Sequence, residues 1–578
     1  MKITRQKHVW LIAFLLLLTG LAYAQNSLPF SKGVNLLDFF TTWNQSDKLP
    51  DMYRYDEADF ICMKSMGIDV IRLAICFDYQ MEPEDTGKIR EEVLKKLDEV
   101  CDLAEKHQIY LIIDNHSFGT RWDLDTTTPK VIEEHLTSLW SQLAPRYKDR
   151  SEYIIYEIQN EPGFRTGSDW NKIQQRMIDL IRTYDTKHAI IVSPQNFSAI
   201  DDLLKLKPYK DPNLIYTIHF YEPLVFCHQG DDIAGEGSRN LLDLAFPYDK
   251  NKLPKYQGKT VESWEELLKI EEKTGSWFYW GLQTYPKEGN VKFINDRIKK
   301  AAAWAKKNKV RLFCGEIGSG VTTRLSYRAA WNKAVSDTLK EYNIPYCTWG
   351  LDYGCGFLDF GDTGIEEAGC IFPDDINKEL VESYGFSMPD ADSVANTTFN
   401  SFPQKQYIVF DGICGKNISF NQFGNIELIN EEDLHGYCLK AKYTGQSGTV
   451  FFPPKKIISA FAANREALCI SFSVKFTDKN QTLDLHLNDT DEGSELPPWQ
   501  NTYTVKASDY KTDQWVTVVI PVSKFKESGA WSPKVNQWFD PQGKFDWSRF
   551  EGIVFEIKSE NDLMKGDLYI DDIVIKKK

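Results

Sequence analysis

Residues 153–162, with the sequence YIIYEIQNEP, decide the fold of the first part of the chain. The first seven, Tyr153–Gln159, are mostly β-branched or aromatic, which predicts a strand that is buried on both faces. The next two, Asn160 and Glu161, are polar, and Pro162 cannot continue a central strand. A buried strand that stops at polar residues is typical of a parallel sheet with a functional site at the carboxyl ends of its strands.

The same unit, a short apolar run and then a longer helical segment, recurs along the chain. The strand-like runs are Gly33–Leu37, Val70–Ile75, Tyr110–Asp114, Tyr153–Gln159, Ala189–Ser193, Leu214–His219, Arg311–Gly315 and Tyr346–Gly350. A segment such as Glu91–His107, between two of these runs, carries its apolar residues on one helical face. Alternating strands and helices predict parallel strands, and eight repeats predict a closed (β/α)8 TIM barrel rather than an open sheet.

The chain has 578 residues, which is enough for two or three domains. Its composition changes near residue 386, since Met388–Phe402 is rich in Ser, Asn, Thr, Asp and Pro and lacks periodicity. Beyond it, helical patterns stop and runs of alternating polarity are separated by turn residues. These runs are Thr449–Phe452, Cys469–Phe476, Thr482–Leu487, Thr502–Val505, Trp515–Val522, Gly552–Ile557 and Asp567–Ile575. We therefore predict a TIM-barrel domain at 25–386, a linker at 387–402 and an all-β sandwich at 403–578.

The N-terminus has the three parts of a secretory signal peptide. Positive charges come first, on Lys2, Arg5 and Lys7. The ten apolar residues Val9–Leu18 follow, and Ala22-Tyr23-Ala24 then supplies small residues for a peptidase. We predict a signal peptide at 1–24 and export to the periplasm, the cell surface or the medium. A membrane anchor is the alternative, although the apolar run is short for a span.

Charge and cysteine content limit the partners. The net charge of −15 argues against a nucleic-acid duplex, whose phosphates need a basic face, and suits a neutral polymer. The 11 cysteines form no framework of disulfides, no CxxC motif and no cluster with histidine, so no zinc site is predicted. Six lie in apolar runs and are expected to be small buried residues: Cys62, Cys76, Cys101, Cys314, Cys347 and Cys469. One or two disulfides after export remain open.

Polar residues stand where the predicted strands end, which in a barrel of this type is the catalytic face. They are Arg72, the group Asp114-Asn115-His116, Asn160, Glu161, His219, Tyr221, Glu316 and Trp349. Cleavage of an acetal needs two carboxyl groups, one to donate a proton and one to attack the anomeric carbon. Glu161 and Glu316 belong to the fourth and seventh strands, so they face each other across the mouth of the predicted barrel.

This set resembles glycoside hydrolase family 5 and its clan of retaining enzymes over residues 30 to about 385. The resemblance implies that Glu161 is the acid/base and Glu316 the nucleophile, and that no cofactor is required. It assigns substrate binding to six residues: Arg72, His116, Asn160, His219, Tyr221 and Trp349. Arg72 and Tyr221 would keep Glu316 charged, and Asn160 would bind the sugar 2-hydroxyl. The histidines would bind hydroxyls or orient the carboxyls, and Trp349 would lie under the sugar.

Each of these residues alone has a structural explanation, such as a buried ion pair or a core histidine. The joint pattern favours a secreted retaining hydrolase of β-linked polysaccharide, with an endo-β-1,4-glucanase as the first reading. Mannan, β-1,3-glucan, mixed-linkage glucan and exo action remain open, because barrels change substrate by changing loops. A glycan-binding protein with an inactive barrel is the remote alternative. The long connection Glu222–Gly289 is expected to build part of the site or to be a surface insertion.

The C-terminal part resembles jelly-roll carbohydrate-binding modules. Its opening Phe410-Asp411-Gly412 and its closing Asp567–Ile575 carry the resemblance. Candidate stacking residues are Trp499, Tyr503, Trp531, Trp538 and Trp547, with packing in the core as the alternative for each. Because some modules of this type hold a structural calcium ion, Asp411 and Asp571 are candidate ligands.

Overall fold

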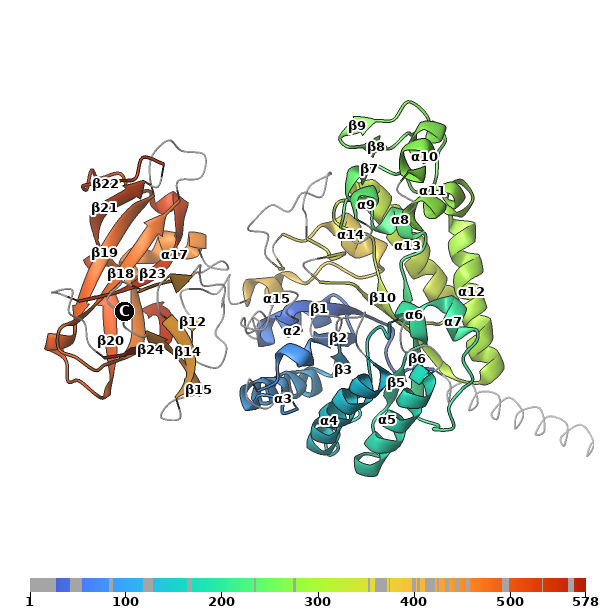
Figure 1. Cartoon of the computed structure of the whole chain (residues 1–578), viewed down its shortest axis with the longest axis horizontal. Helices are drawn as coiled ribbons and strands as arrows, with labels where there is room; N and C mark the ends of the chain where they lie inside the picture. The colour runs from blue at the N-terminus through green and yellow to red at the C-terminus, as the bar shows by residue number, and fades with distance from the viewer. Residues whose placement is uncertain are drawn as a thin grey trace, which may run out of the picture. The chain divides into compact units, whose positions relative to one another are not determined.

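The computed structural model describes most of the chain (Figure 1). The described residues are 27–41, 55–82, 87–117, 128–163, 169–232, 235–273, 277–351, 354–358, 372–373, 375–397, 402, 406–410, 422–423, 426–431, 436–441, 448–452, 458–490, 498–532, 534–559 and 566–578. They form two compact units, whose longest segments are Leu97–Asp390 and Ala391–Lys578. The predicted signal peptide, 1–24, lies outside the described residues.

The first unit is a closed barrel of eight parallel strands. They are β1 (Lys32–Phe40), β2 (Val70–Ile75), β3 (Tyr110–Asn115), β4 (Ile154–Glu157), β5 (Ile190–Val192), β6 (Leu214–Phe220), β10 (Arg311–Ile317) and β11 (Tyr346–Thr348). Their order around the barrel is β1-β11-β10-β6-β5-β4-β3-β2, so β1 and β2 close it. The TIM barrel predicted from the sequence is confirmed, and each strand lies where an apolar run predicts one.

Helices connect the strands and cover the outside of the barrel, as α3, α4 and α5 show in Figure 1. The longer ones are α2 (Glu57–Ser65), α3 (Glu91–His107), α4 (Pro129–Tyr147), α5 (Trp170–Tyr184), α12 (Val291–Asn308) and α13 (Leu325–Glu341). Local sequence sets their starts: Thr128 accepts from the amide of Val131 at the start of α4, and Asn290 accepts from Phe293 at the start of α12.

Each strand except β1 contributes one side chain to an apolar layer of the barrel. The layer consists of Val70, Ile112, Ile155, Ile191, Ile215, Phe313 and Cys347, and Phe30 packs against it. These residues come from the amino-terminal or middle part of their strands. The layer fills the barrel below the carboxyl ends of the strands. The polar residues at those ends lie above it and are not part of this apolar layer.

The long connection between β6 and β10 forms a small subdomain, which Figure 1 shows as the green elements gathered at one end of the barrel. It contains α8 (Leu224–Cys227), α9 (Glu236–Asn240), a three-stranded sheet, α10 (Trp264–Glu272) and α11 (Trp277–Glu288). The sheet consists of β7 (Leu241–Leu242), β8 (Lys255–Tyr256) and β9 (Lys259–Thr260). Because α8 begins four residues after β6 ends, the subdomain starts at the rim of the carboxyl face.

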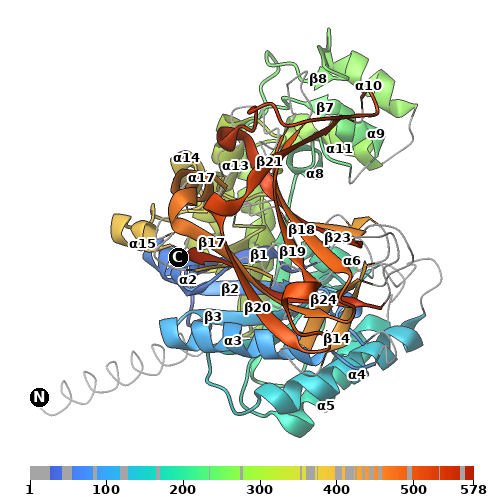
Figure 2. The same ribbon diagram turned by 90° about the vertical axis from the view of Figure 1, so that its left-hand side faces the viewer.

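The second unit is an antiparallel sandwich, seen from another side in Figure 2. One sheet has the order β14-β15-β24-β17-β20, with β12 paired to β24, and the other has the order β13-β16-β23-β18-β19-β21-β22. The strands of the first sheet are β12 (Tyr407–Phe410), β14 (Ile426–Glu431), β15 (Gly436–Ala441), β17 (Leu468–Phe476), β20 (Trp515–Pro521) and β24 (Leu568–Lys577). Those of the second are β13 (Gln422–Phe423), β16 (Gly448–Phe452), β18 (Gln481–Asp489), β19 (Trp499–Lys506), β21 (Lys526–Ser532), β22 (Gln537–Phe539) and β23 (Phe550–Ser559).

The β-sandwich is confirmed, but the expectation that it lacks helices is wrong. The helix α17 (Ile458–Asn464) precedes β17, and its Phe461 is buried in the core between the sheets. This apolar contact explains why a short helix is stable there. A second short helix, α15 (Ala391–Ala395), lies within the predicted linker. The boundaries 25–386, 387–402 and 403–578 stay predictions.

Two further expectations from the sequence concern the state of the cysteines and the presence of a membrane-spanning helix. All nine described cysteines are free and buried, including the six that were expected to be small core residues. Cys370 and Cys414 lie outside the described residues. In the described part of the chain, no helix combines the length and the hydropathy needed to span a bilayer.

Candidate active site

The carboxyl ends of the strands bring the eight predicted site residues together. Glu161 follows β4 and Glu316 lies in β10. The register between β10 and β6 shifts between Cys314 and Glu316, and beyond the shift Glu316 is the partner of His219. An irregularity of this kind changes the direction of a side chain. It places Glu316 beside His219 at the mouth of the barrel.

The two glutamates face each other across His219. Its Nδ1 is 2.6 Å from Oε1 of Glu161 and 3.4 Å from Oε2 of Glu316. One oxygen of each carboxyl and one nitrogen of His219 all lie within 4.8 Å of one another. The carboxyl oxygens are therefore close enough to act on the same bond from opposite sides.

Arg72 is fully buried below the glutamates and holds the site together. Its Nη1 donates to Oε1 of Glu316 at 2.9 Å. Its Nε and Nη2 donate to the two carboxyl oxygens of Glu157, at 2.7 and 2.9 Å. Nη2 also lies 3.0 Å from Oδ2 of Asp114 and 2.8 Å from Oδ1 of Asn160. One guanidinium thus orients three carboxyl groups and two amides, those of Asn160 and Asn35.

Arg72 also determines the orientation of the Asn160 amide and, through it, the tautomer of His116. A guanidinium only donates, so the amide oxygen of Asn160 must face it and the amide nitrogen must face away. That nitrogen lies 3.3 Å from Nε2 of His116, which must therefore accept. The proton of His116 is then on Nδ1, which donates to Oδ2 of Asp114 at 2.7 Å. One N–H of Asn160 remains for a ligand.

Tyr221 and Trp349 complete the set. The hydroxyl of Tyr221 donates to Oε2 of Glu316 at 2.8 Å. The ring of Trp349 is stacked on that of His116, with centroids 5.2 Å apart and an angle of 23° between the planes. All eight predicted residues are thus at one site, and their roles stay predictions.

The pKa values differ between the two glutamates for physical reasons. Burial raises the pKa of Glu161 to about 8, although Arg72 opposes the shift. Burial also raises the pKa of Glu316, but His219 and Arg72 both act against it. Glu316 accepts hydrogen bonds from Arg72 and Tyr221, whereas the carboxyl group of Glu161 pairs with His219 alone among the described residues. Hydrogen bonds of this kind favour the ionised form, so Glu316 is the better anion and Glu161 the better acid.

Two buried residues of the site, Glu157 and Asn35, were missed by the sequence interpretation, and a third, Asp114, was named at its strand end but given no role. Glu157 binds Arg72 through both oxygens, Asp114 accepts from His116, and Asn35 accepts from Arg72 at 2.9 Å. Burial raises the pKa of Glu157 and of Asp114 to about 7 each. A signal was present, because a charged residue inside an apolar strand needs a partner when it is buried. Glu157 in YIIYEIQ and Asp114 in YLIID are residues of this kind, as is their partner Arg72 in VIRLAI.

Two groups of described residues have the spacing of metal ligands. Glu161, His219 and Glu316 form the first, but the oxygens of Glu316 already accept from Arg72 and Tyr221. Asp484, His486 and Glu556 form the second, in the sandwich. Of the two predicted calcium ligands, Asp411 lies outside the described residues. Asp571 is buried and accepts from the amide of Asp572 at 2.8 Å, and no finding supports a calcium ion there.

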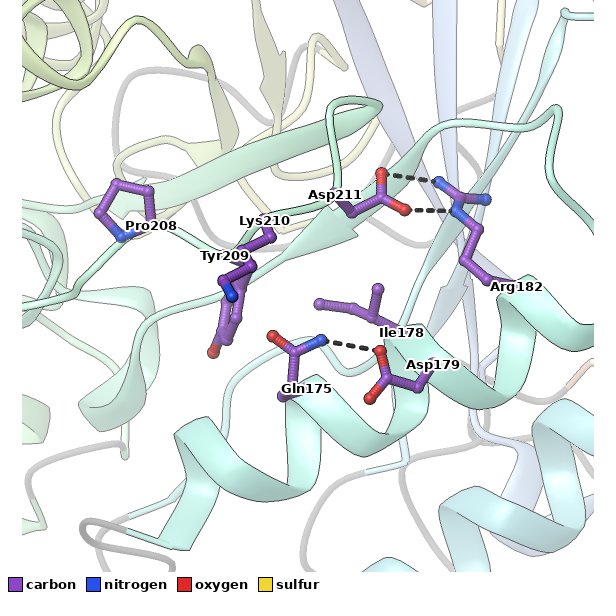
Figure 3. A pocket seen from close by; sticks show the side chains of 8 residues that line it. All are labelled: Gln175, Ile178, Asp179, Arg182, Pro208, Tyr209, Lys210 and Asp211. Atoms are coloured by element: carbon purple, nitrogen blue, oxygen red, sulfur yellow. Dashed lines mark hydrogen bonds and ion pairs between the residues drawn. The ribbon is translucent and has the colours of Figure 1, made fainter.

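A pocket on the outside of the barrel is separate from the cluster of site residues at the carboxyl ends of the strands (Figure 3). It is lined by Gln175, Ile178, Asp179, Arg182, Pro208, Tyr209, Lys210 and Asp211. Arg182 binds Asp211 there through two contacts of 2.6 and 3.3 Å. The segment 208–211 leads into the amino end of β6, whereas the cluster lies at the carboxyl ends. The pocket therefore contributes nothing to the strand-end site.

Two facing carboxyl groups at the ends of the fourth and seventh strands of a TIM barrel define a class of protein, the barrel glycoside hydrolases. The model of the cellulase family, glycosyl hydrolase family 5, matches residues 31–354. The chain belongs to this family, and it is a glycoside hydrolase.

Known proteins of this kind resemble the first part of the chain. Endoglucanase 3 of Fibrobacter succinogenes is 29% identical over 360 residues, which cover 58% of this chain and 52% of that protein. Endoglucanase C of Acetivibrio thermocellus is 26% identical over 330 residues, which cover 56% of this chain and 91% of that protein. The solved structure of endoglucanase Cel5A from Thermotoga maritima is 24% identical, covers 63% of this chain and 99% of its own, and has a TM-score of 0.48. This chain thus spans about half the length of endoglucanase 3.

Proposed function

We propose that the protein is a retaining endo-β-1,4-glucanase that works by double displacement. The observation that carries the proposal is the spacing of the glutamates, since one oxygen of each carboxyl lies within 4.8 Å of the other. Retaining glycosidases hold their carboxyl groups about 5–5.5 Å apart, whereas inverting enzymes separate them by about 6.5–9.5 Å to admit a water molecule. The short spacing supports direct attack by one of the carboxylates.

In the first step, an oxygen of Glu316 attacks the anomeric carbon while Glu161 gives its proton to the glycosidic oxygen. The bond to the leaving sugar breaks and a glycosyl ester forms on Glu316. Tyr221 and Arg72 hold the nucleophile in place before the attack. The remaining N–H of Asn160 is available to the sugar 2-hydroxyl, a contact that strengthens in the transition state.

In the second step, Glu161 is ionised and takes a proton from a water molecule. The hydroxide attacks the anomeric carbon, the ester bond to Glu316 breaks, and the product leaves with its original configuration. His219, whose pKa is lowered to about 4 by burial, is neutral near pH 7. Its hydrogen bond to Glu161 therefore orients the acid/base without adding a positive charge.

The β-1,4-glucan is proposed as substrate because the similar proteins named above are endoglucanases. Mannan, β-1,3-glucan, mixed-linkage glucan and exo action are the alternatives, and they depend on the loops around the site. A panel of soluble β-glucans and β-mannans, with product lengths measured over time, distinguishes them. Endo action predicts a rapid fall in polymer length, and release of one small sugar from the start would contradict it.

Two variants test the roles of the glutamates. Glu316→Ala removes the attacking group and should abolish turnover of every substrate. Glu161→Ala removes proton donation, which is worth about 10²–10⁴ in rate, and should be milder on an aryl glycoside with a good leaving group. Azide should partly restore Glu161→Ala and give a glycosyl azide of retained configuration. Glu134→Ala, at an exposed position, is the control. A glycosyl azide of inverted configuration from Glu161→Ala would mean that Glu161 is the nucleophile and Glu316 the acid/base.

We also propose that the protein is exported through the signal peptide at 1–24 and that the sandwich is a carbohydrate-binding unit. The tripartite N-terminal sequence supports the first proposal. The antiparallel sandwich with exposed tryptophans supports the second. N-terminal sequencing of the mature protein tests export, and a start at Gln25 is expected.

A further inference from the structure

Two tryptophans of the sandwich are neighbours across a pair of edge strands and expose their rings. Trp531 in β21 and Trp538 in β22 are direct partners in the sheet. Trp531 is 44% exposed and Trp538 is 43% exposed. Among the other candidate stacking residues, Trp499 is buried, and Tyr503 and Trp547 pack against the hydrophobic core. The structure therefore separates two rings that face outward from three that stabilise the fold.

Gly529 explains how the ring of Trp538 is held. A Cβ atom at Gly529 would meet the backbone oxygen of Phe539 first, and it would lie 2.6 Å from Cζ2 and 2.8 Å from Cε2 of Trp538, so the indole rests directly against the backbone of β21. Gly529 also has a φ of +126°, which other residues rarely adopt. The indole is thus supported from below by the sheet and open above. A fixed aromatic surface loses little conformational entropy when it binds a ligand.

Polar side chains continue the same face of the sheet. Gln500 of β19 pairs with Gly529 on one side and with Asn488 of β18 on the other, so all three lie on the face of Trp538. Side chains alternate along a strand, which puts His486 on that face as well. From β18 to β22 the face spans three strand spacings, or about 14 Å. We call Trp531, Trp538, Gln500, Asn488 and His486 the tryptophan strip.

The polar end of the tryptophan strip is held by a network. Nδ1 of His486 lies 2.7 Å from Oγ1 of Thr502, and its Nε2 lies 2.9 Å from Oε2 of Glu556. Nζ of Lys558 lies 2.8 Å from Glu556 and 3.1 Å from Asp484. The ammonium of Lys558 takes the place that a metal ion would need between these carboxylates. The network is thus an ordered set of donors and acceptors in which one ammonium lies between two carboxylates.

We propose that the tryptophan strip binds a chain of a neutral β-linked glucan. The proposal rests on the proposed function of the sandwich as a carbohydrate-binding unit and names its site. Flat sugar faces would lie on the two indoles, and hydroxyl groups would meet the side-chain amides at the other end, while the buried His486 orders the network behind them. The two carboxylates of the network outnumber its one ammonium, and together with the net charge of −15 they disfavour an acidic polymer, which agrees with a neutral one. A width of about 14 Å suits a chain rather than one sugar.

The test uses the full chain with Glu316→Gln, so that the polymer is not hydrolysed. Retention on insoluble cellulose and retardation in native gels with mixed-linkage β-glucan measure binding. Trp531→Ala with Trp538→Ala should weaken binding by roughly tenfold or more, since each ring contributes a large apolar contact. Trp538→Phe should keep most of the affinity. Gly529→Ala should lose it although both rings remain, because its Cβ would push away the backbone of β22 at Phe539 together with the indole of Trp538.

Controls separate this site from the barrel and from misfolding. Val535→Ala removes an exposed apolar side chain between the two strands, and Trp280→Ala removes an exposed ring of the first unit. Val535→Ala should bind the polymers as the parent does, and Trp280→Ala should not reproduce the loss seen in the double variant. With Glu316 restored, the double variant should hydrolyse soluble oligosaccharides at the parent rate. Unchanged polymer binding in the double variant, or no binding by the parent, would overturn the proposal. Failure of the enzyme to hydrolyse any glucan would instead overturn the proposed function of the barrel.

Discussion

Arg72 shows how single residues set the chemistry of the site. Its guanidinium is enclosed by Glu157, Asp114 and Glu316, and every one of these carboxyls is within 3.0 Å of it. Removing one partner of such a buried group is costly, since the others are left with an uncompensated charge. Because the three carboxyl groups share one positive charge, the strength of the ion pair between Arg72 and Glu316 depends on Glu157 and Asp114, which are buried beneath the site.

The pKa of Glu161 predicts an alkaline limit to activity. Glu161 must carry a proton to act as an acid, and burial raises its pKa to about 8. The value of kcat/KM should therefore be sustained at neutral pH and fall as the pH rises through about 8. At the acid end, activity should fall as Glu316 becomes protonated. A pH profile on an oligosaccharide checks this, and full activity well above pH 9 would contradict the assignment of Glu161.

Glu157→Gln tests whether this residue positions the nucleophile through Arg72. The amide offers one oxygen to two donors of Arg72, which leaves a buried donor unpaired at a cost of about 1–3 kcal/mol. The unpaired donor lets the guanidinium shift, and with it the carboxylate of Glu316 that it holds. We expect kcat to fall more than tenfold while KM changes little, because the nucleophile is displaced and the groups that contact the sugar remain. Glu134→Gln, at an exposed site, should change neither.

A purely structural role of Glu157 would give a different result. The melting temperature would fall, but kcat of the folded fraction would stay near that of the parent. Sequence interpretation found the eight strand-end residues, named Asp114 without giving it a role, and missed Glu157 and Asn35. Strand ends can be read from a sequence, whereas the partners of a buried arginine depend on which side chains of different strands meet inside the barrel.

At the scale of elements, the irregularity in β10 positions the catalytic pair. The pairing of β10 with β6 loses its regular register between Cys314 and Glu316, at Gly315. A Cβ at Gly315 would lie 3.0 Å from both Nε2 of His219 and Oγ1 of Thr217. The close approach of β10 to β6 thus needs a residue without a side chain. The sequence shows the glycine before Glu316 but not the neighbour that requires it.

Gly315→Ala should therefore act on the site rather than on the fold. The added methyl group would push His219 by a few tenths of an ångström, and His219 orients Glu161. We expect a fall in kcat of roughly tenfold or more, because small displacements of catalytic groups cost rate steeply. Gly320→Ala is the control, since its nearest contact would be at 3.3 Å. Equal activity of the two variants would contradict the role given to Gly315.

The elements of the chain differ in how well the sequence predicts them. All eight barrel strands and α3 follow from periodicity, because a buried parallel strand is a continuous apolar run and an exposed helix has an apolar face. The helix α17 was missed, since seven residues are too few for a helical period to stand out. The short edge strand β22 was missed as well, because its residues have no apolar core face to reveal them.

At the scale of the whole molecule, chemistry and attachment are assigned to different units. The barrel carries the carboxyl pair, and the sandwich carries the tryptophan strip. Linking a catalytic site to a second binding site raises the effective concentration of a polymer without any new contact in the active site. The fold of both units could be predicted from the sequence. The substrate could not, because it depends on loop residues whose contacts no local pattern encodes.

The central claim is that Glu316 attacks the anomeric carbon directly, and the configuration of the first product tests it. Proton NMR of a cello-oligosaccharide digest, recorded within the first turnovers and before mutarotation, measures the two anomers separately. Two carboxyl oxygens within 4.8 Å of each other predict a double displacement, and hence the β-anomer first. Initial appearance of the α-anomer would mean that water attacks in a single step, and would contradict the assignment of Glu316 as the nucleophile.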